Sequence, residues 1–413
     1  MNTGYASPAI IKNKSGNTWR DVKAAILVRN FAKSGGLELY AYKLIKGLLA
    51  YGLDITVICE QAKVQLAHER LKVVEVPHHK TGASKARQLE HYCKEFSSAL
   101  DRLGPFEIVH SHHVGATPVN VVTFHNHTVF RIEECGKSIE AEINKFKLLF
   151  RSDYKLRQDM DARLTKSAEV LIFPSKVCKQ DYVKHYHLNR PASLVVAYPG
   201  WQLGEDSKIE KINSADNQPI LPVNFPADHD KNRTIIFVGR GYRKKGLDVL
   251  LSACSLLQRN NYSFKLLIAG LNEKAIDRLR LYCLGLNKCV SYLGFQKNMN
   301  SLYEAASIIV SPSRLEPFGM AVLQGMSYGL VPVVSKVSGV AELLSHDKDA
   351  LIIENHLDAA ELAKKLAYLL DNEDQLNRLS KQAQAKAKTI NWQTTVDTTL
   401  AAYRQIFHKK YII

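Results

Sequence analysis

The sequence has few cysteines and no long apolar run. Seven cysteines occur among 413 residues, without a Cys-x-x-Cys pair, which excludes a disulfide framework or a zinc ribbon and fits reduced thiols. No apolar segment approaches the roughly 18–20 residues that span a bilayer. The first twenty residues lack the apolar core of a secretory signal. We therefore expect a cytoplasmic protein.

The composition lacks the biases of disordered, fibrous or coiled-coil chains. Hydrophobic residues make up 46% and charged residues 23%, which is typical of globular proteins, and the length predicts two domains. Lys and Arg number 56 against 40 Asp and Glu, a formal net charge of +16. This excess favours an anionic partner, which composition leaves open between nucleic acid, a phosphate-bearing small molecule and an anionic membrane face.

The first half of the chain reads as a doubly wound α/β domain. Residues 1–22 are polar and aperiodic and predict a flexible tail. The apolar run Ala24–Val28, the turn Ser34-Gly35-Gly36 and an apolar stripe of helical spacing predict strand, glycine turn and helix. Further short apolar runs predict strands at 55–59, 73–76, 108–109, 119–124 and 170–173. Such alternation predicts a parallel sheet that binds ligands at the carboxyl ends of its strands.

A second α/β series follows a proline-containing linker, which we assign to residues 216–232. The domains are then predicted at 23–215 and 233–390, with a helix in 391–413. Apolar runs predict strands of the second domain at 234–238, 264–269, 290–293, 308–310 and 331–334. The fold class predicted is α/β, with two Rossmann-like doubly wound parallel-sheet domains that face a central cleft.

Residues 139–166 look like one long helix rich in basic and aromatic residues. It is either an amphipathic helix packed on its own domain or a membrane-interface surface. In the second case Phe146, Leu149 and Phe150 face lipid, and basic neighbours such as Lys145 and Arg151 face the headgroups.

One segment of the second domain has the composition of a diphosphate site. In Phe237–Asp248 a strand enters a glycine turn that holds Arg240, Lys245 and two further cations, and a helix begins near Gly246. Close backbone approach at glycine, cationic side chains and a helix N-terminus are what a pyrophosphate requires. The spacing fits neither a P-loop nor a G-x-G-x-x-G fingerprint. A solvated basic loop is the alternative.

A second segment places a carboxylate before a helix. Glu316 follows the strand at 308–310, and a helix begins near Gly319. The amides of Phe318, Gly319 and Met320 then lie beside the Glu316 carboxylate, which can accept hydrogen bonds from sugar hydroxyls. Gln324 is expected about two helical turns further on, on the same side.

These two segments resemble the retaining GT-B glycosyltransferases of family 4 (glycosyl transferases group 1), whose second domain carries the signature Glu, seven residues, Glu. The resemblance implies that Glu316 and the amides of Phe318, Gly319 and Met320 bind the sugar of a nucleotide-sugar donor. It also implies that Arg240 and Lys245 bind the donor diphosphate. The second Glu of the signature, which holds the ribose, is replaced here by Gln324, whose amide can hydrogen-bond a diol without charge.

The resemblance extends to the first half of the chain. Gly35 and Gly36 match the family's glycine loop, which approaches the donor phosphates and the acceptor. His125, after the strand at 119–124, matches a histidine close to the transferred sugar, and His127 is a weaker candidate; the alternative is a structural histidine. Trp392 matches the start of the C-terminal helix that crosses back to the first domain, and an ordinary terminal helix is the alternative.

No metal or other cofactor is implied. His110-Ser111-His112-His113 has a metal-ligand spacing, but no acidic residue follows it at the spacing of a metal hydrolase. Asp159-Met160-Asp161 and Asp228-His229-Asp230 match the Asp-x-Asp of metal-dependent transferases in composition only. Neither lies at a strand end, and both are expected to face solvent.

The resemblance implies a retaining, metal-independent glycosyltransferase that moves a hexose from a nucleoside-diphosphate sugar, with UDP-hexose as the best single guess. The acceptor implied is a bacterial glycolipid or lipopolysaccharide core, reached by peripheral contact with the anionic cytoplasmic face of the inner membrane. One alternative is a polysaccharide or glycogen-type synthase of the same fold. A sugar-nucleotide binder weakened by Gln324 is another. A nucleic-acid partner is suggested by charge alone, without a recognition motif.

Overall fold

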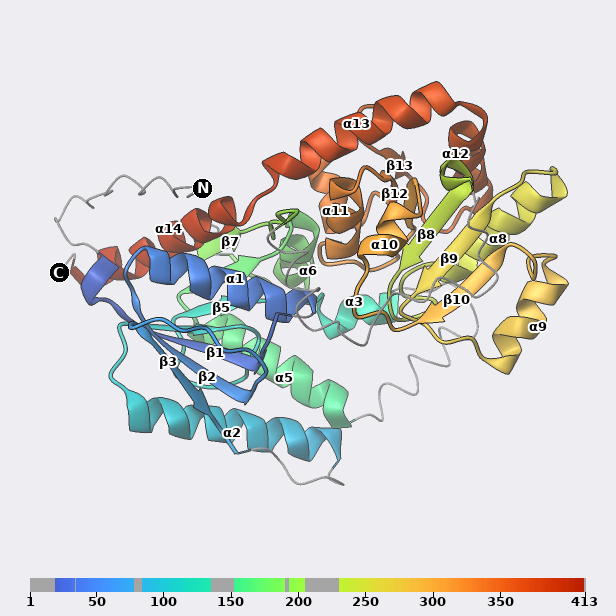
Figure 1. Cartoon of the computed structure of the whole chain (residues 1–413). Coiled ribbons are helices and arrows are strands. Elements are labelled where there is room, and N and C mark those ends of the chain that lie inside the picture. The colour runs from blue at the N-terminus through green and yellow to red at the C-terminus, as the bar shows by residue number, and fades with distance from the viewer. Residues whose placement is uncertain are drawn as a thin grey trace. The chain divides into compact units, whose positions relative to one another are not determined.

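The computed structural model describes residues 19–33, 35–77, 84–134, 152–189, 193–204 and 230–411. The chain divides into two compact units. The first unit contains the residues up to Thr123 together with Asp159–Leu171 and Val396–Ile413, and the second contains Phe124–Gln158 and Ile172–Thr395. Figure 1 shows the elements of both.

The first sheet has seven strands in the order β3-β2-β1-β4-β5-β6-β7. They are β1 (Lys23–Phe31), β2 (Asp54–Ala62), β3 (Leu71–Glu75), β4 (Ile108–Ser111), β5 (Val121–Thr123), β6 (Val170–Phe173) and β7 (Leu194–Val196). Ala24 of β1 lies opposite Ile55 of β2 and Ile108 of β4, both in parallel pairs. The strand order reverses beside β1, as in doubly wound folds. The predicted fold class is confirmed for this half.

The helices connected to this sheet are α1 (Gly36–Ala50), α2 (Lys85–Leu103), α3 (Val129–Glu134), α5 (Ser152–Ser167), α6 (Lys176–Tyr186) and α14 (Trp392–Tyr411). The C-terminal helix α14 packs back on the first unit. Tyr51 donates a hydrogen bond of 2.6 Å to Asp397, and the Tyr403 hydroxyl lies 2.7 Å from Nδ1 of His110. Of the long helix expected over 139–166, residues 139–151 lie outside the described residues. Among the helices described, none is both long and apolar enough to cross a membrane.

Two expectations about the first unit are wrong. The tail was expected to extend to residue 22, but η1 (Trp19–Asp21) is ordered, with the Trp19 ring 6.4 Å from Tyr403 and 6.1 Å from Phe407. Asp161 was expected to face solvent, but it is buried, and His113 Nε2, 2.7 Å from its carboxylate, offsets the loss of water. Asp159 is exposed. In the part of the chain described, no group of three or more His, Cys, Asp or Glu is arranged to hold a metal.

The histidines at the end of β4 form part of a buried polar cluster. The rings of His110 and His112 stack at 4.6 Å, and His110 Nε2 lies 2.7 Å from the Thr123 hydroxyl. The pKa of His112 lies well below its usual value of 6.5, chiefly because the side chain is buried and secondly because His110 is its neighbour. His112 is therefore neutral in the folded protein at pH values where the unfolded chain is protonated.

This difference predicts a pH-dependent stability. The pKa of His112 is lower in the folded protein than in the unfolded chain. Its contribution to the free energy of unfolding is therefore complete above pH 6.5 and is lost as the pH falls below that value. The free energy of unfolding should decrease by up to about 1.4 kcal/mol per pH unit. Denaturant unfolding of wild type and His112→Phe at several pH values measures the slope. Equal slopes in the two proteins would contradict this assignment.

The second sheet has six parallel strands in the order β10-β9-β8-β11-β12-β13. They are β8 (Thr234–Val238), β9 (Lys265–Ala269), β10 (Val290–Gly294), β11 (Ile308–Ser311), β12 (Val331–Ser335) and β13 (Leu351–Ile353). The helices of this half are α8 (Leu247–Arg259), α9 (Ala275–Cys283), α10 (Asn300–Glu304), α11 (Met320–Ser327), α12 (Ala359–Asp371) and α13 (Glu373–Thr389). The predicted strands are confirmed, each within a residue or two at its ends.

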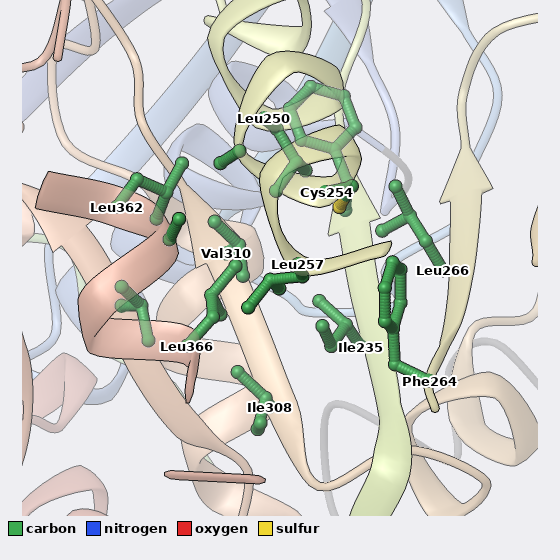
Figure 2. Packing of buried hydrophobic residues seen from close by; sticks show 14 of the residues in the cluster. Ile235, Leu250, Cys254, Leu257, Phe264, Leu266, Ile308, Val310, Leu362 and Leu366 are labelled. Atoms are coloured by element: carbon green, nitrogen blue, oxygen red, sulfur yellow. The ribbon is translucent and has the colours of Figure 1, made fainter. Parts of the chain in front are cut away.

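Apolar residues cover both faces of this sheet, as parallel strands require. Ile235 points to the face covered by α8 and α12, and its neighbour Ile236 points to the opposite face, where α10 packs. Figure 2 shows residues of the first cluster, with Leu257 of α8 beside Ile235 and Leu250 further along the same helix. The buried sheet fixes the positions of the loops that leave β8 and β11.

Candidate active site

The glycine turn predicted as a diphosphate site connects β8 to α8. Gly246 caps α8 with φ of +74°, and a Cβ atom there would lie 2.0 Å from the Pro312 carbonyl oxygen. Only glycine fits this close approach at a positive φ. The turn therefore packs directly on the loop that leaves β11.

Arg314 holds the same two loops together by its side chain. Its guanidinium makes two hydrogen bonds to the Asp248 carboxylate, of 2.7 and 2.6 Å, and a third of 2.5 Å to the Arg243 carbonyl oxygen. The Arg314 backbone amide also donates to the carbonyl oxygen of Lys244 at 3.1 Å. A paired, planar guanidinium fixes geometry as well as contributing energy. Arg314 was not among the residues predicted for the site.

Lys245 and Glu316 come into direct contact. The Lys245 ammonium donates to a carboxylate oxygen of Glu316, and their side chains are 21% and 12% exposed. The two predicted site residues lie 71 positions apart in sequence. The structure thus brings together the cation expected at a diphosphate and the carboxylate expected at sugar hydroxyls.

Arg240 lies on the exposed part of the same turn. Its guanidinium carbon stands 4.7 Å from the centroid of the Phe295 ring, in the loop after β10. Phe295 is 60% exposed, which is unusual for a large aromatic side chain. A cation over an aromatic face is attracted by the ring quadrupole. Phe295 was not predicted, because only this contact distinguishes it from other loop residues.

Glu316 is positioned by a short bridge, not by a helix. It pairs with Ser338, and its carbonyl oxygen accepts a 3.1 Å hydrogen bond from the Gly339 amide. The chain then turns through Phe318 and Gly319, and α11 begins at Met320. The expected spacing of two helical turns from Glu316 to Gln324 is therefore wrong, because the first four residues of that interval are not helical.

Gln324 lies in the first turns of α11 and is partly buried. The Tyr303 hydroxyl, in α10, lies 3.2 Å from its side-chain oxygen in donor geometry. A donor at the carbonyl oxygen orients the amide and fixes the direction of its N–H groups. Tyr303 was not predicted, because nothing in its local sequence separates it from an ordinary core aromatic.

His125 lies in the loop after β5 and is partly buried. Residues 126–128 of this loop are held by α6, mainly through the buried carboxylate of Asp181, a residue that was not predicted. Gly35 precedes α1 in the first unit and Gly36 is the first residue of that helix; both are exposed. Gly35 has φ of +100°, which suits glycine.

Two family descriptions match the chain: Glycosyltransferase Family 4 over residues 34–203 and Glycosyl transferases group 1 over residues 224–386. An uncharacterized glycosyltransferase, MJ1607 of Methanocaldococcus jannaschii, is 28% identical over 341 residues. The aligned part is 77% of this chain and 80% of that relative.

Two solved structures show the same fold. WaaG, a glycosyltransferase involved in lipopolysaccharide biosynthesis, matches with a TM-score of 0.70 at 16% identity, over 92% of this chain and 98% of that chain. Anabaena Alr3699/HepE in complex with UDP-glucose matches with a TM-score of 0.59 at 16% identity, over 95% of this chain and 100% of that chain. With both halves matched and both sheets in place, the chain belongs to the family 4, group 1 glycosyltransferases and has their GT-B fold.

Proposed function

We propose that this glycosyltransferase moves a hexose from a UDP-sugar with retention of configuration and without a metal ion. The observation that carries the proposal is the contact between Lys245 and Glu316 on loops that also present Arg240. Cations for a diphosphate and a carboxylate for sugar hydroxyls are thereby adjacent, as a sugar joined to a diphosphate requires. The fold shared with a UDP-glucose-bound protein supports the choice of base and sugar.

In the proposed reaction, an acceptor hydroxyl attacks the anomeric carbon on the face from which the diphosphate departs. The bond between that carbon and the phosphate oxygen breaks with its electron pair, and the leaving oxygen takes the hydroxyl proton. Arg240 and Lys245 neutralise the diphosphate as its charge grows. The hexose is oriented by Glu316, His125 and the amides of Phe318, Gly319 and Met320. The amide of Gln324 holds the ribose, and Gly35 and Gly36 approach the phosphates.

A donor titration tests this assignment. We expect one of UDP-, GDP-, ADP- and CMP-sugars to bind in metal-free buffer, and Glu316→Ala to weaken that binding at least about tenfold, the effect of one charged hydrogen bond. Calorimetry measures the Kd of each sugar nucleotide for wild type and for Glu316→Ala. An NMR spectrum of the product gives its anomeric configuration. A folded wild-type protein that binds no donor would overturn the catalytic proposal in favour of a different ligand.

For the acceptor we propose a glycolipid or lipopolysaccharide core at an anionic membrane surface. The net charge of +16 and the fold shared with a lipopolysaccharide enzyme support this choice. Attachment by charge predicts release from anionic phospholipid vesicles at high salt. Binding that persists at about 1 M salt, where screening acts within about 3 Å, would exclude this mode of attachment.

A further inference from the structure

The first turn of α6 is fixed to the loop that carries Glu316. Ser175 caps the helix, because its hydroxyl oxygen accepts from the Cys178 amide at 3.1 Å, and it donates to the Pro317 carbonyl oxygen at 2.6 Å. The Glu342 carboxylate accepts from the amides of Lys176 and Val177, at 2.8 and 2.6 Å. A carboxylate at a helix N-terminus satisfies free amides and complements the helix dipole. The start of α6 therefore has a defined position relative to Glu316.

The middle of the same helix holds the loop that carries His125. The carboxylate of Asp181 accepts from the Thr128 amide at 2.8 Å, from the Thr128 hydroxyl at 3.2 Å and from Nδ1 of His127 at 3.1 Å. The side chains of Asp181 and His127 are 2% and 3% exposed. One buried carboxylate thus fixes both residues that follow Asn126.

A second histidine lies against the same carboxylate. His185, one turn along α6, places Nδ1 2.8 Å from the main-chain carbonyl oxygen of Asp181 and 3.0 Å from the carboxylate oxygen that accepts from the Thr128 hydroxyl. Charge-assisted hydrogen bonds inside a protein are stronger than neutral ones in water, and a fully bonded carboxylate makes the surrounding chain rigid. Because His127 is only two positions after His125, the backbone that presents the His125 ring has little freedom.

We propose that Asp181 is a positioning residue for sugar transfer: through His127 and Thr128 it fixes His125, and through α6 it keeps His125 in register with Glu316. This inference rests on the proposed function. Among the described residues the Asp181 carboxylate contacts His127, Thr128 and His185, so its action on His125 and Glu316 is indirect. Its effect should therefore fall on the geometry of the reacting sugar rather than on nucleotide binding.

Asp181→Asn should lower kcat about 10–100-fold, the scale of a misplacement of about 1 Å, while the Kd for UDP changes less than about twofold. Two substitutions at His127 test the hydrogen bond between His127 and Asp181 without changing Asp181 itself. His127→Asn keeps an amide donor where Nδ1 stands and should retain most of kcat. His127→Gln places its amide where Nε2 stands and should lose activity as Asp181→Asn does.

Asp349→Asn is the matched control. Asp349 is a buried aspartate that also accepts from a backbone amide, that of Ser345 at 2.7 Å, but it contacts no part of the His125 loop among the described residues. It should lower thermal stability and leave kcat unchanged. Wild-type kcat in Asp181→Asn, or equal losses in the two His127 variants, would overturn the positioning role alone. A wild-type protein that transfers sugar from no donor would instead overturn the proposed function.

Discussion

Lys245→Ala should weaken UDP binding about 100-fold, and adding Glu316→Gln should recover part of that loss. Lys245 has two partners in the proposed complex, the diphosphate and the Glu316 carboxylate that it contacts in this structure. Removing the ammonium deletes a charged hydrogen bond and leaves a largely buried carboxylate unpaired beside an anionic ligand. Together these effects amount to about 3 kcal/mol. Neutralising Glu316 then removes the repulsion, so UDP affinity rises again.

The single variant Glu316→Gln separates the two halves of the donor. UDP should bind it as well as it binds wild type or better, because Lys245 is released from its partner. Transfer of hexose should fall by about 10–1000-fold in kcat/KM, because hydrogen bonds to the sugar hydroxyls are weakened where they stabilise the transition state. Calorimetry with UDP and initial rates with the UDP-sugar measure the two effects.

An exposed pair of the same residue types is the control. Lys336 and Glu354 lie 2.8 Å apart with side chains 66% and 64% exposed. Such pairs contribute about 0–1 kcal/mol, so Lys336→Ala and its double variant with Glu354→Gln should leave the Kd for UDP unchanged. If the effects of Lys245→Ala and Glu316→Gln on UDP binding prove simply additive, the two side chains do not act on the ligand as a pair.

Apolar runs predicted six of the seven strands of the first sheet and five of the six strands of the second, and they missed the short edge strands β7 and β13. Thr234–Val238 has no polar residue after Thr234, so it can be buried on both faces, and the structure places it at the centre of the second sheet. The loops at Arg240 and Glu316 could be singled out from the sequence for a related reason. Each is a contiguous stretch in which glycine and charge precede a helix start, and its role in donor binding stays a prediction.

Residues that act through long-range contacts were not predictable. Asp181 and Phe295 occur in ordinary helix and loop sequences, and only the fold brings them to the His125 loop and to Arg240. The error at Asp161 has the same origin, since a charged residue within a polar helix is usually solvated unless a partner such as His113 lies opposite. Local sequence carries local geometry, whereas the partners of a buried charge depend on the packing of distant segments.

Gly246→Ala should destabilise the second unit by about 3 kcal/mol. Two costs add at this position. An alanine at φ of +74° is strained by about 1–2 kcal/mol. Its Cβ would also stand 2.0 Å from the Pro312 carbonyl oxygen, so the turn and the loop after β11 must separate, at a cost of about 1–3 kcal/mol.

Because Lys245 precedes Gly246 directly and Glu316 follows Pro312 closely, that separation should also break the contact between the ammonium and the carboxylate. UDP affinity should therefore fall at least about tenfold in the molecules that remain folded, the effect of one charged hydrogen bond. Gly285→Ala is the matched control, since Gly285 has φ of +72° but no heavy atom within 4 Å of an added Cβ. It should cost about 1–2 kcal/mol from strain alone and leave UDP binding intact. Equal decreases in melting temperature in the two variants would mean that the turn accommodates the methyl group without moving the loop after β11. Close packing at Gly246 would then not set the geometry of the donor site.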